Sequence, residues 1–235
     1  PPCAYDDSTA FDVEATLVLS EFDADLNNLA DPNTFDLLNY HPEYWLINGR
    51  AYPDTLLPNG HVSRPNQPVT SAISAAAGQR VLVRYLNPGL LHHTMQLLGT
   101  HQSVIARDGN PLFDAFDAIS ETIPSGQTTD VIITIPAAAA SGTRFPLYNR
   151  QMHLTNGPIT SSPHAPGGMM TFIEVPAPVS PIVTVTVADT NSTPESGLPV
   201  YVFDGATYTG YNGVTNGSGQ VTFTLPVGSY RFRAD

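Results

Sequence analysis

Short runs of β-branched and aromatic residues alternate with turn residues along most of the chain and predict strands. In the segment 80–86, Val81, Val83 and Tyr85 occupy every second position, as expected for a strand with one buried face. Runs of this length and spacing are typical of a β-sandwich or barrel. Before residue 178 the predicted strands are 14–20, 44–47, 80–86, 94–99, 103–106, 130–135 and 169–175.

Helical periodicity is scarce by comparison. The longest candidate helices are the segments 21–28 and 32–39, and each allows at most about three turns. Acidic residues, with Glu21 and Asp23 among them, crowd the segment 6–25, but their spacing does not match a calcium-binding loop. We therefore predict an all-β fold and a solvated acidic surface over this segment.

A proline-rich segment, PAPVSP at 176–181, divides the chain. Prolines at this density remove hydrogen-bond donors from any continuing sheet and favour an extended spacer. Beyond it, short strand-like runs are separated by Asp-Gly and Asn-Gly turn signals. We therefore predict two domains, 1–177 and 178–235. The predicted strands of the second domain are 183–189, 199–204, 206–211, 220–226 and 229–234.

The charge of the chain excludes several classes of function. Its 235 residues carry a formal net charge of −12, and all nine basic residues are arginines. Nucleic-acid binding needs clustered cations, and Schiff-base or P-loop chemistry needs lysine, so neither is expected. No run approaches the roughly 18 apolar residues of a membrane span. Cys3 is the only cysteine, so no intrachain disulfide or cysteine-based zinc site is predicted.

Four sequence stretches in the first domain resemble, in the same order, the motifs of a known protein family. They are YWLINGRAYPD at 44–54, RVLVRYLNPG at 80–89, VIARDGNP followed by IPSGQTTD over 104–130, and FPLYNRQMH through GGMM over 145–170. In this order they resemble the "INGR…P", strand, "A-x-DG-x-P" and "PGQR-x-D" motifs of a multicopper-oxidase-type cupredoxin domain. The resemblance implies a cupredoxin-like Greek-key sandwich for residues 1–177.

The resemblance also implies where copper would bind. A type 1 copper site needs two imidazoles and a thiolate, usually with an axial thioether. The family's His-Cys-His triplet aligns with Asn149, Arg150 and Gln151 in this sequence, and its His-x-His-Gly motif aligns with residues 96–99, QLLG. A guanidinium cannot ligate copper. Both copper centres of the family are therefore expected to be dismantled in this segment.

A residual metal site is the alternative. His92 or His93 matches the position of the first type 1 imidazole, and His153 and Met169 lie in the expected loop. Imidazole suits copper and zinc, so His92, His93, His153 and Met169 are the candidate metal ligands. Because the thiolate is missing, we favour the interpretation that these are ordinary core and loop residues. No resident cofactor and no catalytic residue is predicted.

The second domain resembles the carboxypeptidase-regulatory-like or bacterial Ig-like modules of surface proteins. Its pattern includes GLPVYVF at 197–203, TNGSGQVTF at 215–223 and LPVGSYRF at 225–232. The resemblance implies a small Ig-like β-sandwich with a spacer or adhesion role. About five strand-like runs are present, whereas such a sandwich generally has about seven. Either the parent protein continues beyond this chain, or a strand donated by another chain completes the sheet.

Three functions fit these patterns. The first is a secreted or cell-surface, non-catalytic structural or assembly unit, which polymerises into a filament or binds protein partners through residues 178–235. A start at Pro-Pro-Cys rather than Met indicates a processed or truncated piece, consistent with such a location. The second is the copper-free portion of an active multicopper oxidoreductase. The third is a surface adhesin that binds through exposed aromatic side chains, with Tyr201, Tyr208 and Tyr211 as contact candidates.

Overall fold

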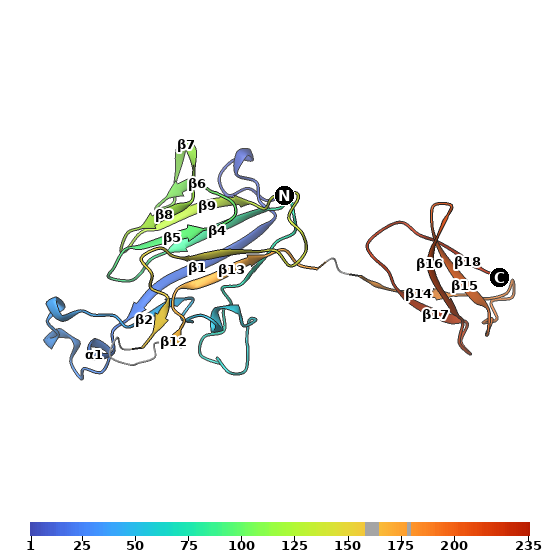
Figure 1. Cartoon of the computed structure of the whole chain (residues 1–235), viewed down its shortest axis with the longest axis horizontal. Helices are drawn as coiled ribbons and strands as arrows, with labels where there is room; N and C mark the ends of the chain where they lie inside the picture. The colour runs from blue at the N-terminus through green and yellow to red at the C-terminus, as the bar shows by residue number, and fades with distance from the viewer. Residues whose placement is uncertain (158–164, 178–179) are drawn as a thin grey trace. The chain divides into compact units, whose positions relative to one another are not determined.

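The computed structural model describes residues 1–157, 165–177 and 180–235, and the chain is all-β (Figure 1). His164, a further histidine between His153 and Met169 in the sequence, lies outside the described residues. The chain divides into two compact units, Pro1–Pro176 and Ala177–Asp235, and this division falls within the proline-rich segment. Each unit has its own hydrophobic core, so each is described by itself. Among the described residues, no helix has the length and apolar character needed to cross a bilayer.

The larger unit contains an eight-stranded sheet and a five-stranded sheet. The first has the order β12-β11-β2-β1-β4-β9-β6-β7, and the second has the order β3-β13-β10-β5-β8. The strands are β1 (Val13–Phe22), β2 (Tyr44–Ile47), β3 (Ile73–Ser74), β4 (Arg80–Leu86), β5 (His93–Leu97), β6 (Gln102–Arg107), β7 (Asn110–Ala118), β8 (Ser120–Ile123), β9 (Thr128–Thr134), β10 (Arg144–Asn149), β11 (Thr155–Asn156), β12 (Ala165–Pro166) and β13 (Met170–Glu174).

The alternation of β4 explains how the larger unit forms its core. Val81, Val83 and Tyr85 are fully buried in the main cluster, which confirms the predicted face. Leu82 lies on the other face and is also fully buried, because Phe11 and two isoleucines cover it in a second, smaller cluster. Strand β4 pairs in parallel with β1 and antiparallel with β9. A central strand of this kind is expected to be apolar on both faces.

Strands with polar or proline-containing sequences were not among those predicted from the alternation. They include β7, whose sequence NPLFDAFDA carries two acidic residues and is exposed at almost every position. Strands β8 and β10 were also not predicted, although their inward residues Ile123, Phe145 and Leu147 are buried. An edge strand such as β7 has no partner on one side, so it has little need for an apolar pattern.

The predicted helices are almost absent, and this corrects the sequence-based expectation. Glu21 and Phe22 end strand β1, and α1 spans only Ala24–Asn27. The Asp23 carboxylate caps this turn by accepting from the Leu26 N–H. The segment 32–39 forms two 3-10 turns instead of one helix. The 3-10 turns of the chain are Asp7–Thr9, Pro32–Thr34, Leu37–Asn39 and Asp54–Leu56.

The smaller unit is built from a two-stranded and a three-stranded sheet. Strand β14 pairs with β17, and the other sheet has the order β16-β15-β18. Val200, Val202 and Leu225 are fully buried in its core, with Val221 and Phe223 beside them. All-β architecture is thus common to both units. The strands are β14 (Ile182–Thr186), β15 (Pro199–Asp204), β16 (Thr207–Val214), β17 (Gln220–Thr224) and β18 (Arg231–Ala234).

Candidate functional site

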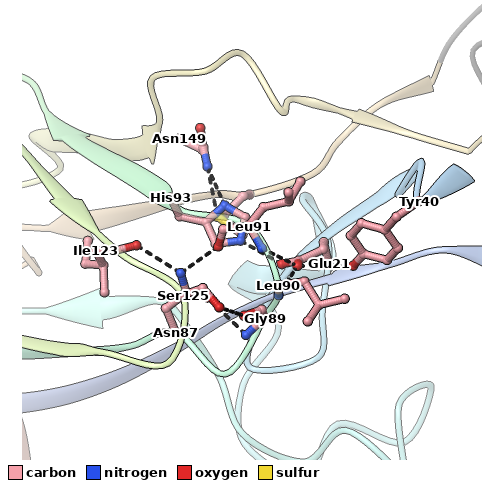
Figure 2. Close-up of polar contacts among 11 residues, drawn as sticks. Glu21, Tyr40, Asn87, Gly89, Leu90, Leu91, His93, Ile123, Ser125 and Asn149 are labelled. Carbon is pink, nitrogen blue, oxygen red and sulfur yellow. Dashed lines mark hydrogen bonds and ion pairs between the residues drawn. The ribbon is translucent and has the colours of Figure 1, made fainter. Parts of the chain in front are cut away.

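A buried polar cluster lies where β1, β5 and β10 approach one another, and His93 is at its centre (Figure 2). His93 begins β5 and its side chain is fully buried, whereas its neighbour His92 is exposed. The Nε2 atom of His93 lies 2.8 Å from Glu21 Oε2. The Nδ1 atom lies 3.0 Å from the amide nitrogen of Asn149. His93 is therefore held at both ring nitrogens.

Glu21 fixes one side of this cluster. Its Oε1 accepts from the backbone N–H groups of Leu90 and Leu91, at 2.5 and 2.9 Å, and from the Tyr40 hydroxyl at 3.1 Å. Burial alone would raise the pKa of this carboxyl, but His93 and the two backbone donors together lower it. The side chain is fully buried. The prediction of a solvated acidic surface is therefore wrong at Glu21, because its carboxylate satisfies donors inside the fold.

The charge on Glu21 determines the proton position on His93. An ionised carboxylate can only accept, so the proton of the neutral imidazole lies on Nε2. The Nδ1 atom of His93 then carries a lone pair, and the amide group of Asn149 donates to it. The same amide nitrogen of Asn149, Nδ2, also lies 3.4 Å from the sulfur atom of Met169.

Asn149 ends strand β10 with its side chain directed inwards. Phe145, Leu147 and Asn149 alternate along the strand and are all buried. Its Oδ1 accepts from the Gln151 N–H at 2.8 Å, so both ends of the amide have partners and its orientation is fixed. The –NH2 group consequently faces His93 and Met169, the latter of which is also fully buried.

His153 completes the cluster from the loop after β10. Its ring stacks on Trp45, with centroids 3.4 Å apart and an interplanar angle of 6°, and lies 6.1 Å from the His93 ring. Its Nδ1 is buried without a hydrogen-bond partner among the described residues. Burial, with a further contribution from His93, lowers the pKa of His153 to about 4. His153 is therefore neutral at physiological pH.

These residues do not fit a type 1 copper centre. Two imidazoles and a thioether are present in the cluster, but a thiolate is not. The one cysteine, Cys3, is exposed and pairs through its backbone with Ala10 near the N-terminus. The Asn149 –NH2 group points at two of the lone pairs that a metal would need. Within residues 1–157, 165–177 and 180–235, no three His, Cys, Asp or Glu side chains form a metal-binding group.

The structure brings together three of the four candidate ligands. His93, His153 and Met169 converge, whereas His92 points to solvent. The alignment of Arg150 with the thiolate position is not supported by the geometry, because Arg150 is exposed and its guanidinium contacts Ser120 Oγ. The residue that contacts both His93 and Met169 is Asn149 instead.

Glu21 and Asn149 were not predicted to belong to a buried cluster, although a signal was present. Leu17, Leu19 and Glu21 share one face of β1, and the two leucines are buried. Asn149 likewise follows Phe145 and Leu147 at alternate positions. In a strand, side chains two residues apart lie on the same face. The alternation thus predicts that Glu21 and Asn149 point into the core.

Comparison with solved structures shows a cupredoxin-like fold that is similar to parts of multicopper oxidases. A blue copper oxidase from Nitrosomonas europaea is 20% identical, with a TM-score of 0.55, over 70% of this chain and 44% of that chain. The multicopper oxidase mgLAC is also 20% identical, with a TM-score of 0.55, over 78% of this chain and 48% of that one. This chain therefore spans less than half of either protein.

Sequence identity of 20% supports a shared fold, and the chemistry of this chain is inferred from its own residues. No protein-family model matches the chain, and no curated protein matches it. The cupredoxin-like, all-β prediction is confirmed. The Ig-like character of the smaller unit remains a prediction.

The buried His153 predicts a loss of stability in mild acid. Its pKa is about 4 in the folded chain, against roughly 6.5 when unfolded, so the unfolded state takes up the proton first as the pH falls. The free energy of unfolding should fall between about pH 6.5 and 4, by up to roughly 1.4 kcal/mol per pH unit. Glu21, whose pKa is lowered, adds a loss at still lower pH. Denaturant titrations followed by Trp45 fluorescence measure this slope.

A His153→Phe variant is the matched control, because a phenyl ring keeps an aromatic face against Trp45 and cannot titrate. We expect its stability to vary less over this pH window than that of the native chain. His93, His92 and Glu21 are the titratable groups that act on His153 and are unchanged in the variant. An equal slope in both proteins would contradict the assignment to His153.

Proposed function

We propose that this chain is a non-catalytic structural or assembly unit of a secreted or cell-surface protein that resembles a multicopper oxidase. The observation that carries this proposal is the hydrogen-bonded amide of Asn149 between His93 Nδ1 and Met169 Sδ. An amide –NH2 group is a donor and cannot ligate copper. The cupredoxin-like unit then serves as a rigid body rather than as a redox centre.

The energetics of the cluster support this proposal. To reach His93 Nδ1 and Met169 Sδ, a metal would have to displace the Asn149 amide and leave its N–H groups unpaired inside the core. An unsatisfied buried donor costs about 1–3 kcal/mol. The remaining ligands are neutral imidazoles and a thioether, and the one nearby anion, Glu21, already accepts four hydrogen bonds. The described cluster therefore offers Cu(II) no anionic ligand that is not already engaged in hydrogen bonds.

Metal analysis of the native chain, produced in copper-supplemented medium and then dialysed, tests the proposal. We expect well under one copper per chain and no absorbance band near about 600 nm, where thiolate-to-Cu(II) transitions fall. We also expect no oxygen consumption with one-electron donors. Stoichiometric copper accompanied by oxygen reduction would contradict a non-catalytic role.

A second candidate is the copper-free portion of a larger, active oxidoreductase. The observation in its favour is that the chain spans only 44% and 48% of the two oxidases described above. In this case the cupredoxin-like unit would orient flanking domains that hold copper. The sequence of the parent protein tests this candidate, since flanking His-Cys-His motifs would support it and their absence would contradict it.

We further propose that the unit 177–235 provides the contacts for assembly. Strands β14 and β17 form a sheet of two, so the outer edge of each has no neighbour among the described strands. Strand β18 is at the end of the other sheet and is exposed at all four positions. Free edges of this kind can accept a strand from another chain, which is the donation predicted from the sequence.

A further inference from the structure

The outer face of the β16-β15-β18 sheet gathers aromatic and cationic side chains. Val200 and Val202 of β15 point into the core, so Tyr201 and Phe203 lie on the opposite, outer face. In the register of the sheet, Tyr201 is opposite Arg233 and Phe203 is opposite Arg231. Tyr208 of β16 is opposite Phe203. We call these five residues the aromatic–arginine face: Tyr201, Phe203, Tyr208, Arg231 and Arg233.

Ring and cation contacts confirm that these side chains lie together. The Tyr208 ring is 6.0 Å from Tyr201 and 5.6 Å from Phe203, and the Arg233 guanidinium lies 5.9 Å from the Phe203 ring. An open hollow of about 310 Å³ adjoins them between β15 and β18, and Arg231 is among its lining residues. Of the three tyrosines predicted as contacts, Tyr211 does not share this face. Tyr211 is 43% exposed, but it lies in the irregular step of β16 between the Tyr201–Asn212 and Phe203–Tyr208 pairs, and the ring contacts of this face involve Tyr208 instead.

The charge of this face is unusual within the chain. Arg231 and Arg233 are the only basic residues of 177–235, in a protein with net charge −12. Arg233 is paired with Asp235, whereas Arg231 has no carboxylate partner within the described part of the chain. An exposed guanidinium beside aromatic rings is a composition that recurs at the energetic centres of protein interfaces. The face therefore suits an acidic partner.

The ring angles favour a protein partner over a single-stranded nucleic acid. The Tyr201 and Tyr208 rings are inclined at 71°, and the Phe203 and Tyr208 rings at 54°. Single-stranded nucleic acids bind where successive bases stack on exposed aromatic rings. Rings inclined to one another at these angles do not form one flat platform, whereas tyrosine and arginine together are enriched at protein interfaces.

A surface with the complementary composition exists on the other unit of the same chain. Strand β7 is at the edge of the eight-stranded sheet and carries Phe113, Asp114, Phe116 and Asp117. Phe113 is 101% exposed and Phe116 is 42% exposed, so no other part of the described chain covers Phe113. Neither aspartate forms an ion pair within the described residues. Exposed phenylalanines beside unpaired carboxylates match tilted rings beside an unpaired guanidinium.

We propose that the aromatic–arginine face of one chain docks on strand β7 of a second copy. In this contact the free edge of β7 lies against the aromatic–arginine face, so that Arg231 and Arg233 reach Asp114 and Asp117 along that edge and the exposed phenylalanines pack against the tyrosines. The two surfaces differ, so the contact is heterologous, and its repetition gives an open chain of subunits unless it closes into a ring. The inference rests on the proposed assembly role and specifies the surfaces that perform it.

Charge reversal with rescue tests this contact. Sedimentation velocity of the native chain should show a mass that rises with protein concentration and falls at high salt, because exposed charges are screened. Arg231→Glu with Arg233→Glu should weaken self-association at least about tenfold, and so should Asp114→Arg with Asp117→Arg. The four changes combined restore opposite charges across the contact and should bring the dissociation constant back to within about threefold of the native value.

The variant Arg64→Glu with Arg144→Glu is the matched control. It changes the net charge by the same amount as the arginine reversal, at solvent-accessible arginines of the larger unit that contact Asp54 and Glu174 rather than β7, and should associate more strongly than either of the reversed pairs. A native chain that stays monomeric at all concentrations overturns the proposal. So does self-association that is insensitive to salt and to both reversals, which would point to the free strand edges instead. Copper analysis is independent of each of these results, so failure here is distinguishable from failure of the non-catalytic assignment.

Discussion

Replacing Asn149 with cysteine is expected to make the buried cluster bind about one Cu(II) ion and absorb near about 600 nm. The change supplies the missing thiolate at the residue that already contacts His93 and Met169. It also removes the –NH2 group that occupies their lone pairs, while His153 Nδ1 is already without a partner among the described residues. Copper titration followed by absorbance and electron paramagnetic resonance measures the result.

Two controls make this experiment specific. Arg150→Cys places a thiol at the neighbouring position, which motif alignment assigns to the family cysteine, and it should give no such band because that side chain is exposed. Asn149→Ser removes the amide without supplying a thiolate and should not give the band either. A blue band in Arg150→Cys, together with none in Asn149→Cys, would show that position 150, and not position 149, faces His93 and Met169.

The metal-free Asn149→Cys protein should be less stable than the native chain. It exchanges the amide donor to His93 Nδ1 for a thiol, which is only a weak donor, so this buried acceptor is poorly satisfied at a cost of up to about 1–3 kcal/mol. Copper bound at the organised site of the folded state should recover stability as its concentration rises. The metal-free variant should therefore unfold at a lower temperature than the native chain, and added copper should raise that temperature.

Glu21→Ala should produce the largest loss of stability of any single substitution in the cluster. The carboxylate accepts from His93, Tyr40 and the N–H groups of Leu90 and Leu91, and all four donors would lose their partner. Breaking a buried charged network in this way typically costs about 3–5 kcal/mol. Urea unfolding at neutral pH measures the change in the free energy of unfolding.

Glu14→Ala is the comparison within the same strand. Glu14 pairs with Arg84 across β1 and β4, but its side chain is 45% exposed. Removing an exposed pair should cost less than about 1 kcal/mol. If the two variants lose the same stability, the Glu21 network does not hold the cluster together as described.

The alternation of side chains would have predicted more of this site than motif alignment does. His93 shares a parity with the buried Met95 and Leu97, which distinguishes it from His92 on the exposed side of β5. Motif alignment places the family's cysteine at Arg150, one residue after Asn149, which is the residue that contacts His93 and Met169. In a strand, a shift of one residue moves a side chain to the opposite face, so this displacement changes a buried group into an exposed one.

Other features depend on contacts that the order of residues does not contain. Glu21 precedes its partner His93 by 72 residues, and no local pattern indicates that they meet. Strand β7 was not predicted because an exposed edge imposes no apolar alternation on its sequence. The pairing of β15 with β18, which places Phe203 beside Arg231, likewise appears only once the sheet has formed.

The central claim is that the Asn149 amide occupies the place of a metal between His93 and Met169. Long-range proton–nitrogen NMR of the imidazoles during titration with Cu(I) tests it most directly, because Cu(I) is the ion best suited to two imidazoles and a thioether. We predict that His93 stays protonated on Nε2 and that its Nδ1 resonance does not move. Stoichiometric, simultaneous shifts of the Nδ1 resonances of His93 and His153 would show that the native chain holds a metal there.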